Sequence, residues 1–357
     1  MLVLSNEEIA RLFAVEDCMA ALEPMYRDLA EERALMSPRV DNIAPTAHPG
    51  GYYAFKHMGG TWPAQQIQAL RINSDVVTHP VIAGKARRQK QPLAPGGRWV
   101  GLVLLFSTQT GALLAMFPDG VVQRLRVGAA SGLALKHLAR KDAATLALIG
   151  SGWQAGAQLA AALAARPLKE VRVWSPRKES RDAFVLESRK IHSSIVACDS
   201  VERCVDGADI IAASTSSMVR VIEPKWLKPG VHVSCIKTHE VDGDVLDRCS
   251  RVVLHNKKQA KQLDNVLKDT PNVSAERGKK GWWNDGSGRF EKYPDLCDLL
   301  SGGAEGRKND KEITCFVNNV GTGLQFAAAG AWVLRRAREA GVGTELPDDW
   351  FSEDVHP

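Results

Sequence analysis

A glycine-rich hexapeptide in the middle of the chain has the residue types and spacing that hold a nucleotide phosphate. It consists of Gly150, Ser151, Gly152, Trp153, Gln154 and Ala155. A β-like run over residues 145–149 precedes it, and an alanine-rich helical pattern follows to about residue 165. In such a unit the first glycine makes a tight turn, the second lets backbone approach a pyrophosphate, and the small third residue lets the helix pack on the strand. The pattern predicts a dinucleotide site; the alternative is a glycine turn that only packs.

The tip of the next strand indicates which dinucleotide binds. A second β-like run, Glu170 to Trp174, closes the strand–helix–strand unit. NAD sites usually carry Asp or Glu about 20 residues beyond the glycines, where the carboxylate holds the ribose 2′-hydroxyl. Here Ser175, Arg177 and Lys178 follow the strand instead. Because a hydroxyl and two cations suit a 2′-phosphate, we expect NADP(H) to be preferred and NAD(H) to be possible. The alternative is a solvated basic turn.

The elements around this unit predict a doubly wound parallel sheet over roughly residues 128–312, because its strands are separated by helices. The expected elements are a helix over 180–192, a strand over 195–197, a helix over 201–206, and strands over 208–214, 231–236 and 251–254. Ser214, Thr215 and Ser216 at the end of one strand are expected to contact the cofactor. Residues 256–284 predict a helix and loop, and residues 315–340 predict a long helix that returns to the first domain.

The N-terminal third predicts two helices followed by a strand-rich region. Ser5 and Glu8 have the spacing of a capping box, and a second helical pattern covers residues 15–33. The β-like runs cover residues 51–57, 68–77, 99–107 and 112–117, and a helical pattern covers 126–138. A dense basic run over residues 85–90 is expected to be an exposed loop.

Composition excludes several classes of function. With 45% hydrophobic and 24% charged residues, the 357-residue chain is typical of a globular protein with room for two domains. Its formal net charge of +5 is only mildly basic, and no aromatic residues interleave the basic run, so nucleic-acid binding is not expected. The seven cysteines show no C-x-x-C pairing, which argues against a zinc site or a disulfide framework. We expect a cytoplasmic protein that binds no metal and no membrane, because no signal pattern or long apolar run is present.

Several short segments gain significance from their order and spacing. They are Pro38-Arg39-Val40, Tyr53-Ala54-Phe55-Lys56, residues 125–131 (LRVGAAS), the 150–155 loop, Ala208-Asp209-Ile210-Ile211, residues 226–230 (WLKPG) and Glu312-Ile313-Thr314. Together they resemble the ornithine cyclodeaminase/mu-crystallin family over nearly the whole chain. The resemblance implies a homodimer with a substrate-binding and dimerisation domain of residues 1–127 and 313–357. It also implies a Rossmann-type NAD(P)-binding domain of residues 128–312. The expected fold class is therefore α/β, a doubly wound parallel sheet plus a discontinuous α+β domain.

By the same resemblance, Arg39 and Arg126 hold the substrate carboxylate and Lys56 lies beside the reacting Cα. The residue types suit these roles. Guanidinium forks match a carboxylate in bidentate geometry. A lysine between two arginines is suited to proton transfer near neutral pH, because like charges disfavour its ammonium form. Without the resemblance, the alternative is two surface ion-pair partners and an exposed strand lysine.

One segment departs from the family pattern. The cyclodeaminases of the family carry an Asp in a glycine-rich segment that follows the strand after the WLKPG-like turn. Here residues 235–242 read CIKTHEVD, without the glycines. His239, Glu240 or Asp242 can stand near the position of the missing carboxylate, and we assign the catalytic role to Glu240, with Lys237 close by. The alternative is an ion pair at a strand exit.

The expected chemistry is oxidation or reduction at the Cα–N bond of a small amino, imino or 2-oxo acid. We favour an NADPH-dependent imine (ketimine) reductase or amino-acid dehydrogenase, because the chain lacks both the acidic strand tip of NAD sites and the Asp of the cyclodeaminases. The first alternative is ornithine cyclodeaminase, which forms proline and ammonia. A second alternative is a non-catalytic, NADPH-binding protein like mu-crystallin. The presence of Arg39, Lys56 and Arg126 argues against that alternative.

Overall fold

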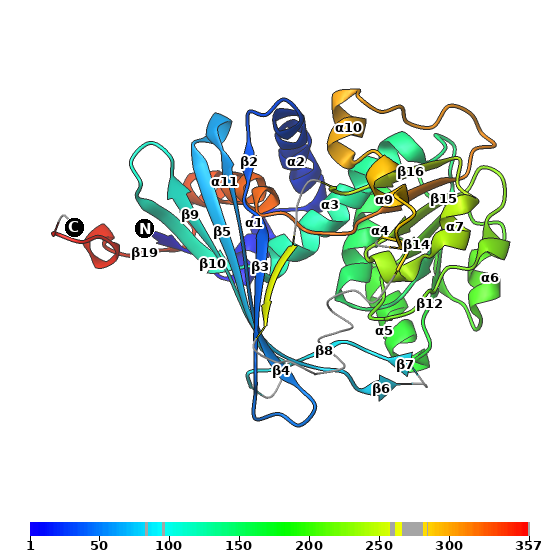
Figure 1. Ribbon diagram of the computed structural model, residues 1–357, viewed down its shortest axis with the longest axis horizontal. Coiled ribbons are helices and arrows are strands. Elements are labelled where there is room, and N and C mark those ends of the chain that lie inside the picture. The colour runs from blue at the N-terminus through cyan, green and yellow to red at the C-terminus, as the bar shows by residue number, and fades with distance from the viewer. Residues whose placement is uncertain (83–84, 95–96, 258–260, 266–280, 284, 356–357) are drawn as a thin grey trace.

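Two large sheets, joined by helices, make up the molecule (Figure 1). The computed structural model describes residues 1–82, 85–94, 97–257, 261–265, 281–283 and 285–355. One sheet is mixed and mainly antiparallel, and the other is parallel, which confirms the predicted fold class of a doubly wound α/β unit with a second α+β unit. Among the described helices, none combines the length and apolar character that crossing a membrane requires.

The first sheet has the strand order β17-β3-β4-β5-β9-β10-β1-β19, with β2 beside β4 and β8 beside β5. Its strands are β1 (Leu2–Val3), β2 (Leu35–Met36), β3 (Arg39–Ala44), β4 (Tyr52–Trp62), β5 (Ile67–Thr78), β8 (Gln89–Gln91), β9 (Val100–Ser107), β10 (Leu113–Pro118), β17 (Lys261–Asn265) and β19 (Thr344–Glu345). Every second residue of β5 is buried along its whole length, so one face of this sheet is covered. The covering helices are α1 (Asn6–Leu12), α2 (Val15–Ala30), α3 (Gly120–Leu138) and α11 (Leu324–Ala340).

The second sheet is parallel and has the order β13-β12-β11-β14-β15-β18-β16. Its strands are β11 (Thr145–Ile149), β12 (Glu170–Trp174), β13 (Ile195–Ala197), β14 (Ile210–Ala213), β15 (His232–Cys235), β16 (Arg251–Leu254) and β18 (Thr314–Val317). Its helices include α4 (Trp153–Ala165), α5 (Lys178–Ser188), α6 (Val201–Val205) and α7 (Gly243–Asp247). The strand order reverses between β11 and β14, and the carboxyl ends of strands at such a point form the usual ligand crevice of an open α/β sheet.

Three expectations for individual segments were wrong. Residues 256–284 were expected to be a helix and loop, but residues 261–265 form β17, which pairs in parallel with β3 of the first sheet; residues 258–260, 266–280 and 284 lie outside the described residues. The 315–340 run begins as strand β18, buried between β15 and β16, and α11 starts only at Leu324. The basic run forms β7 (Lys85–Ala86) and part of β8 rather than a loop. The domain boundaries at 127/128 and 312/313 stay a prediction.

Glycines allow the elements that join the two sheets to approach closely. A Cβ on Gly128 of α3 would lie 2.5 Å from the Ala157 carbonyl oxygen of α4, so these helices meet backbone to backbone. At the start of α11, Gly323 packs on Gly59 of β4, and Gly60 packs on the backbone of Leu324 with no room for a methyl group. The α11 N-terminus is therefore held against β4, the strand that carries Lys56, and α3 is held against α4. The shorter helices α9 (Arg289–Lys292) and α10 (Leu296–Ser301) precede β18.

Candidate active site

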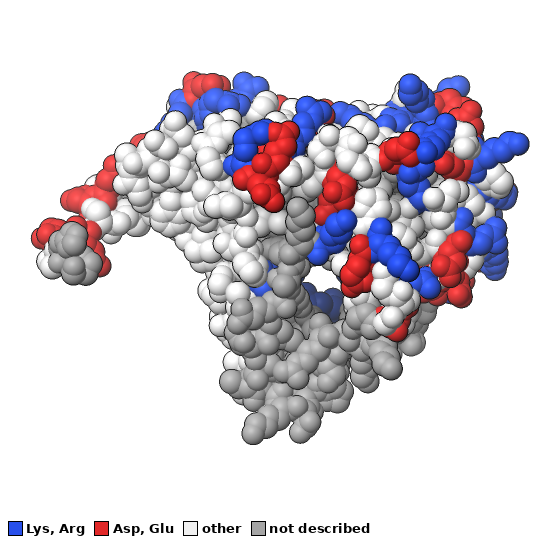
Figure 2. All heavy atoms as spheres, turned by 45° about the horizontal axis from the view of Figure 1, so that its top comes forward, with Lys and Arg blue, Asp and Glu red and all other residues white. Residues whose placement is uncertain are grey.

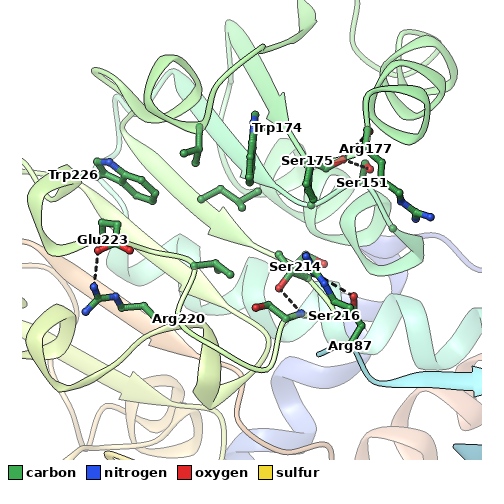
Figure 3. A pocket seen from close by; sticks show the side chains of 18 of the residues that line it. Arg87, Ser151, Trp174, Ser175, Arg177, Ser214, Ser216, Arg220, Glu223 and Trp226 are labelled. Atoms are coloured by element: carbon green, nitrogen blue, oxygen red, sulfur yellow. Dashed lines mark hydrogen bonds and ion pairs between the residues drawn. The ribbon is translucent and has the colours of Figure 1, made fainter. Parts of the chain in front are cut away.

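A cavity of about 520 Å³ opens at the carboxyl ends of β11, β12 and β14 (Figure 3). Its wall brings together eight of the predicted cofactor-binding residues. They are Gly150, Ser151, Gly152, Ser175, Arg177, Ser214, Thr215 and Ser216. Trp174 and Trp226 also line the cavity and give it two indole rings. The strand order therefore unites three separate loops into one pocket at the switch point of the sheet.

The glycine loop has the geometry of a phosphate cradle. Gly150 has a φ of +115°, a conformation that side chains disfavour, and a Cβ there would collide with the Ser214 carbonyl. Gly152 is the N-cap of α4, no side chain caps this helix end, and nothing lies within 4 Å of the position a Cβ would take. The Ser214 hydroxyl is buried and finds no hydrogen-bond partner among the residues that the structure describes. Free helix N–H groups, open space and an unused hydroxyl fit a dinucleotide pyrophosphate.

The other half of the hexapeptide lies outside the cavity wall. The Trp153 ring packs 4.3 Å from the Arg124 guanidinium, and the Gln154 side chain donates to Gln123 Oε1 at 2.8 Å. Ala155 lies in the first turn of α4 and is fully buried. Because the Trp153 and Gln154 side chains are engaged elsewhere and Ala155 is buried, any contact of these three with the cofactor would come from their backbone, and their role stays a prediction.

Of the three residues expected to hold a 2′-phosphate, Ser175 and Arg177 line the cavity and Lys178 lies outside its wall. Ser151 Oγ donates to Ser175 Oγ at 2.9 Å, so the glycine loop and the strand tip are hydrogen-bonded to each other. Arg177 lines the cavity, whereas Lys178 forms an ion pair of 2.5 Å with Asp182, one turn further along α5. Lys178 and Asp182 are four residues apart in the sequence, a spacing that favours an ion pair on a helix. This pair explains why Lys178 points away from the pocket.

Glu240 links the loops that follow β14 and β15. Its side chain is fully buried and accepts hydrogen bonds from the Thr215 N–H (2.6 Å), Thr215 Oγ1 (2.8 Å) and the Ile236 N–H (2.9 Å). Burial raises the pKa of Glu240, and the charge of Lys237 opposes this shift. Glu240 thus fixes Thr215, a residue of the cavity wall.

Two of the three predicted substrate residues, Arg39 and Lys56, lie on the first sheet, which carries a row of polar side chains on its covered face. Lys56 of β4 is 5% exposed and stands opposite Asp41 of β3 on one side and Asn73 of β5 on the other. Side chains opposite one another in antiparallel strands share a face and lie in contact range. Arg39 donates to both carboxylate oxygens of Asp41, at 2.7 and 2.8 Å.

Arg71 extends this row and was not among the residues expected to be functional. It stands opposite Met58, is buried, and donates through Nε to Asp119 Oδ2 at 2.8 Å. Asn73 donates to the same oxygen at 3.1 Å. The sequence does hold a signal for these residues: they fall on alternate positions of β5 together with the buried Ile67, so the strand period places them on its inner face.

Arg126, in the middle of α3, is a buried cation without a counter-ion among the described residues. It is 6% exposed, its Nη1 donates to Gln325 Oε1 at 3.0 Å, and its buried Nε has no hydrogen-bond partner in the part of the chain that the structure describes. Burial, followed by the charge of Arg71, lowers the pKa of Arg126 to about 10. The two guanidinium groups lie 5.4 Å (Arg126) and 5.6 Å (Arg71) from the centre of the Phe326 ring, so they meet around one aromatic side chain.

A buried hydrogen-bond chain fixes Gln325, the neutral partner of Arg126. Gln325 Nε2 donates to the Tyr26 hydroxyl at 2.9 Å, and this hydroxyl lies 2.6 Å from His255 Nε2. Burial lowers the pKa of His255 to about 3, so the ring is neutral and its Nε2 accepts a hydrogen bond from the Tyr26 hydroxyl. Its other nitrogen, Nδ1, donates to the Val320 carbonyl. The chain anchors Arg126 without neutralising it.

Asn318 and Asn319, which directly follow β18, donate hydrogen bonds to backbone carbonyls. Asn318 Nδ2 donates to the Val127 carbonyl of α3 at 3.1 Å, and Asn319 Nδ2 donates to the Asn256 carbonyl at 2.7 Å. Both side chains thus hold the segment between β18 and α11 in place.

Comparison with known proteins decides the family. The sequence model of the ornithine cyclodeaminase/mu-crystallin family matches residues 1–341. The chain belongs to this family. Alanine dehydrogenase of Archaeoglobus fulgidus is 28% identical, with 97% of this chain and 98% of that protein aligned. A Delta(1)-pyrroline-2-carboxylate reductase of Bacillus cereus is 29% identical over 69% of this chain and 74% of that protein.

Solved structures of relatives share the fold. The Thermococcus litoralis Delta(1)-pyrroline-2-carboxylate reductase, whose structure contains NADH and L-proline, superposes with a TM-score of 0.75 at 23% identity. The match covers 97% of this chain and all of that one. The expected family and fold class are thus confirmed for this member of the ornithine cyclodeaminase/mu-crystallin family.

Proposed function

We propose that this protein is an NAD(P)H-dependent oxidoreductase that acts on the Cα–N bond of a small amino or imino acid. The observation that carries the proposal is Arg126. A buried cation without a counter-ion is costly unless an anion joins it, and its free Nε edge offers a fork for a carboxylate. Two similar proteins are named alanine dehydrogenase and Delta(1)-pyrroline-2-carboxylate reductase. Both names agree with a substrate that carries a carboxylate and a reacting nitrogen.

In this proposal the parallel sheet binds the cofactor, and the first sheet together with α3 binds the substrate. Bound NAD(P)H supplies a hydride to the carbon of the imine C=N bond. Arg126 holds the substrate carboxylate, and Arg39 joins it through the guanidinium nitrogen that Asp41 does not occupy. Lys56 donates the proton that the nitrogen takes up as the hydride reaches the carbon, so the imino acid becomes an amino acid. In the reverse direction Lys56 accepts this proton.

Glu240 has a different part in this proposal from the catalytic one expected. Its carboxylate already accepts three hydrogen bonds from the chain, two of them from Thr215. We assign it to positioning the cofactor loop, and Lys56 remains the proton-transfer group.

NADP(H) preference, a homodimer and a cytoplasmic location belong to the same proposal. The NADP(H) preference is supported by Ser175 and Arg177 at the β12 tip, where a 2′-phosphate would bind.

The homodimer is supported by the C-terminal segment. It projects from the body with Trp350 and Phe351 exposed, which suits a surface that a second copy covers (Figure 1). Cysteines without a pairing pattern suit a reducing compartment.

One activity screen tests the function. The protein is incubated with NADPH or NADH, ammonia or methylamine, and a panel of 2-oxo acids and cyclic imines, and absorbance loss at the nicotinamide band is followed. Ornithine with NAD⁺ runs in parallel and is assayed for proline and ammonia. We expect reduction of at least one imine. Proline formed from ornithine without oxidation of NADPH on any imine would make it a cyclodeaminase, and cofactor binding without any turnover would support the non-catalytic alternative.

A further inference from the structure

Arg87 reaches the cofactor cavity from the other half of the molecule. It belongs to the arm, defined here as residues 79–99 between β5 and β9, which includes β6 (Val81–Ile82), β7 and β8. Its backbone forms an antiparallel bridge with Ser217, just beyond the end of β14. Its side chain lines the cavity, together with the glycine loop (Figure 3). A segment of the first sheet thus completes the wall of a pocket in the second.

The Arg87 guanidinium has little to hold it in place within the protein. Its interaction with the described residues is a donation from Nη1 to Ser216 Oγ at 3.5 Å, the outer limit of a hydrogen bond. It forms no ion pair with a described carboxylate, unlike Arg220 in the same wall, which pairs with Glu223 at 2.6 Å. An arginine that faces a pocket with most of its five donors unused is suited to bind an anionic ligand.

The sheet order indicates which part of the cofactor Arg87 meets. Ser175 and Arg177 follow β12, the glycine loop follows β11, and Arg87 contacts the loop after β14, which lies on the far side of β11 from β12. A dinucleotide with its adenosine ribose at the β12 tip has its pyrophosphate over the glycine loop. Arg87 therefore stands beside the pyrophosphate and away from the 2′-position.

We propose that Arg87 is a cofactor-binding residue that contacts the pyrophosphate of the bound dinucleotide, opposite the N-terminus of α4. The inference rests on the proposed use of a nicotinamide dinucleotide. It also gives Arg87 and Arg177 different roles in cofactor binding. Arg87 contributes to the binding of NADH and NADPH alike, because both carry the pyrophosphate, whereas Arg177 distinguishes between them.

The test measures dissociation constants by calorimetry for NADH, NADPH and adenosine 2′-monophosphate, which lacks the pyrophosphate. In Arg87→Ala we expect both dinucleotides to bind about ten- to a hundredfold more weakly, the usual loss for a charge-assisted hydrogen bond, while the monophosphate is unaffected. Arg87→Lys should fall between the two, because it keeps the charge and loses the fork. Arg98→Ala is the matched control: it removes an exposed cation from the same arm, outside the cavity wall, and should leave all three constants unchanged.

Each other outcome has a defined meaning. Unchanged dinucleotide affinity in Arg87→Ala would overturn the inference and leave the proposed function intact. A loss confined to NADPH and the monophosphate would place Arg87 at the 2′-phosphate and overturn the pyrophosphate assignment. Failure of the wild-type chain to bind either dinucleotide would overturn both proposals. Thermal unfolding without cofactor identifies any variant that has lost its fold.

Discussion

The two halves of the molecule build binding sites in opposite ways. The parallel sheet holds its site at the strand ends, where backbone N–H groups, glycines and short hydroxyl side chains form the cavity wall. The first sheet holds its candidate site on a strand face, where Arg39, Lys56 and Arg71 point into a covered interior. One site is made of loop backbone that is free to receive a ligand, and the other is made of buried charges.

This difference separates two energetic problems. Apart from the buried Ser214 hydroxyl, the loop site leaves its donors at an open pocket, so an empty pocket costs little. The face site keeps cations out of water, and neighbouring carboxylates compensate them: Asp41 pairs with Arg39, and Asp119 pairs with Arg71. Arg126 alone of these three arginines lacks such a partner among the described residues. The compensation is therefore incomplete at the position where a substrate carboxylate is proposed to bind.

Removing the Lys56 side chain should have the largest effect on turnover and should leave cofactor binding by the parallel sheet nearly unchanged. We expect Lys56→Ala to lower kcat by about 10²- to 10⁴-fold, the usual contribution of a positioned proton donor. The dissociation constant of NADPH should stay within about twofold, because Lys56 lies on the first sheet. Steady-state kinetics and fluorescence titration measure the two quantities. Lys56→Arg keeps the charge beside Asp41 but does not release its proton near neutral pH, so it should also be slow; wild-type rates in either variant would contradict the assignment.

Arg126→Ala should come next, with kcat/KM lower by about 10²- to 10³-fold from the loss of a buried contact to a carboxylate. The loss should appear mainly in KM for the carboxylate substrate. Arg126→Lys should recover only part of it, because an ammonium cannot form the fork. If Arg126→Ala instead raised the free energy of unfolding and left the kinetics unchanged, the guanidinium would destabilise the fold and have no role in substrate binding.

A change at the β12 tip should affect the cofactor half alone. We expect Arg177→Ala to weaken NADPH binding by about tenfold or more and to leave NADH binding nearly unchanged, since only NADPH carries the 2′-phosphate. Lys178→Ala serves as the control, because the Lys178 side chain pairs with Asp182 outside the cavity wall. Tighter binding of NADH than NADPH by the wild-type chain would defeat the preference for NADP(H).

The smallest expected effect concerns acid stability of the parallel sheet. Burial lowers the pKa of His232 on β15 to about 3, against 6.5 for the free side chain. The folded state therefore binds fewer protons than the unfolded state between these values, so stability falls as pH drops from about 6.5 towards 3. His232→Gln should reduce this slope by roughly 1 kcal/mol per pH unit in urea unfolding between pH 4 and 6. His48→Gln at an exposed site should keep the wild-type slope, and equal slopes in all three proteins would exclude the effect.

The cofactor half could be predicted from the sequence because its signals are local. The strand Thr145–Ile149, the glycine loop and the strand Glu170–Trp174 lie within 30 residues and were predicted with the bounds observed. The substrate face depends on pairings between distant strands, so the strand period places Arg71 on an inner face but does not bring Asp41 and Arg71 together. Strand β18 was missed because its apolar residues run on into the pattern of α11. Arg87 was missed because its place depends on how the arm lies against the other half of the molecule.

The glycine contact between β4 and α11 has a consequence for how this enzyme can diversify. Gly60 and Gly323 touch backbone on the opposite element, so any side chain at either position would force the strand and the helix apart. That displacement would move Lys56 on one element and Gln325, the support of Arg126, on the other. The side chains around this contact can therefore be exchanged more freely than either glycine. The contact thus fixes the spacing between Lys56, the proposed proton donor, and Arg126, the proposed carboxylate-binding residue.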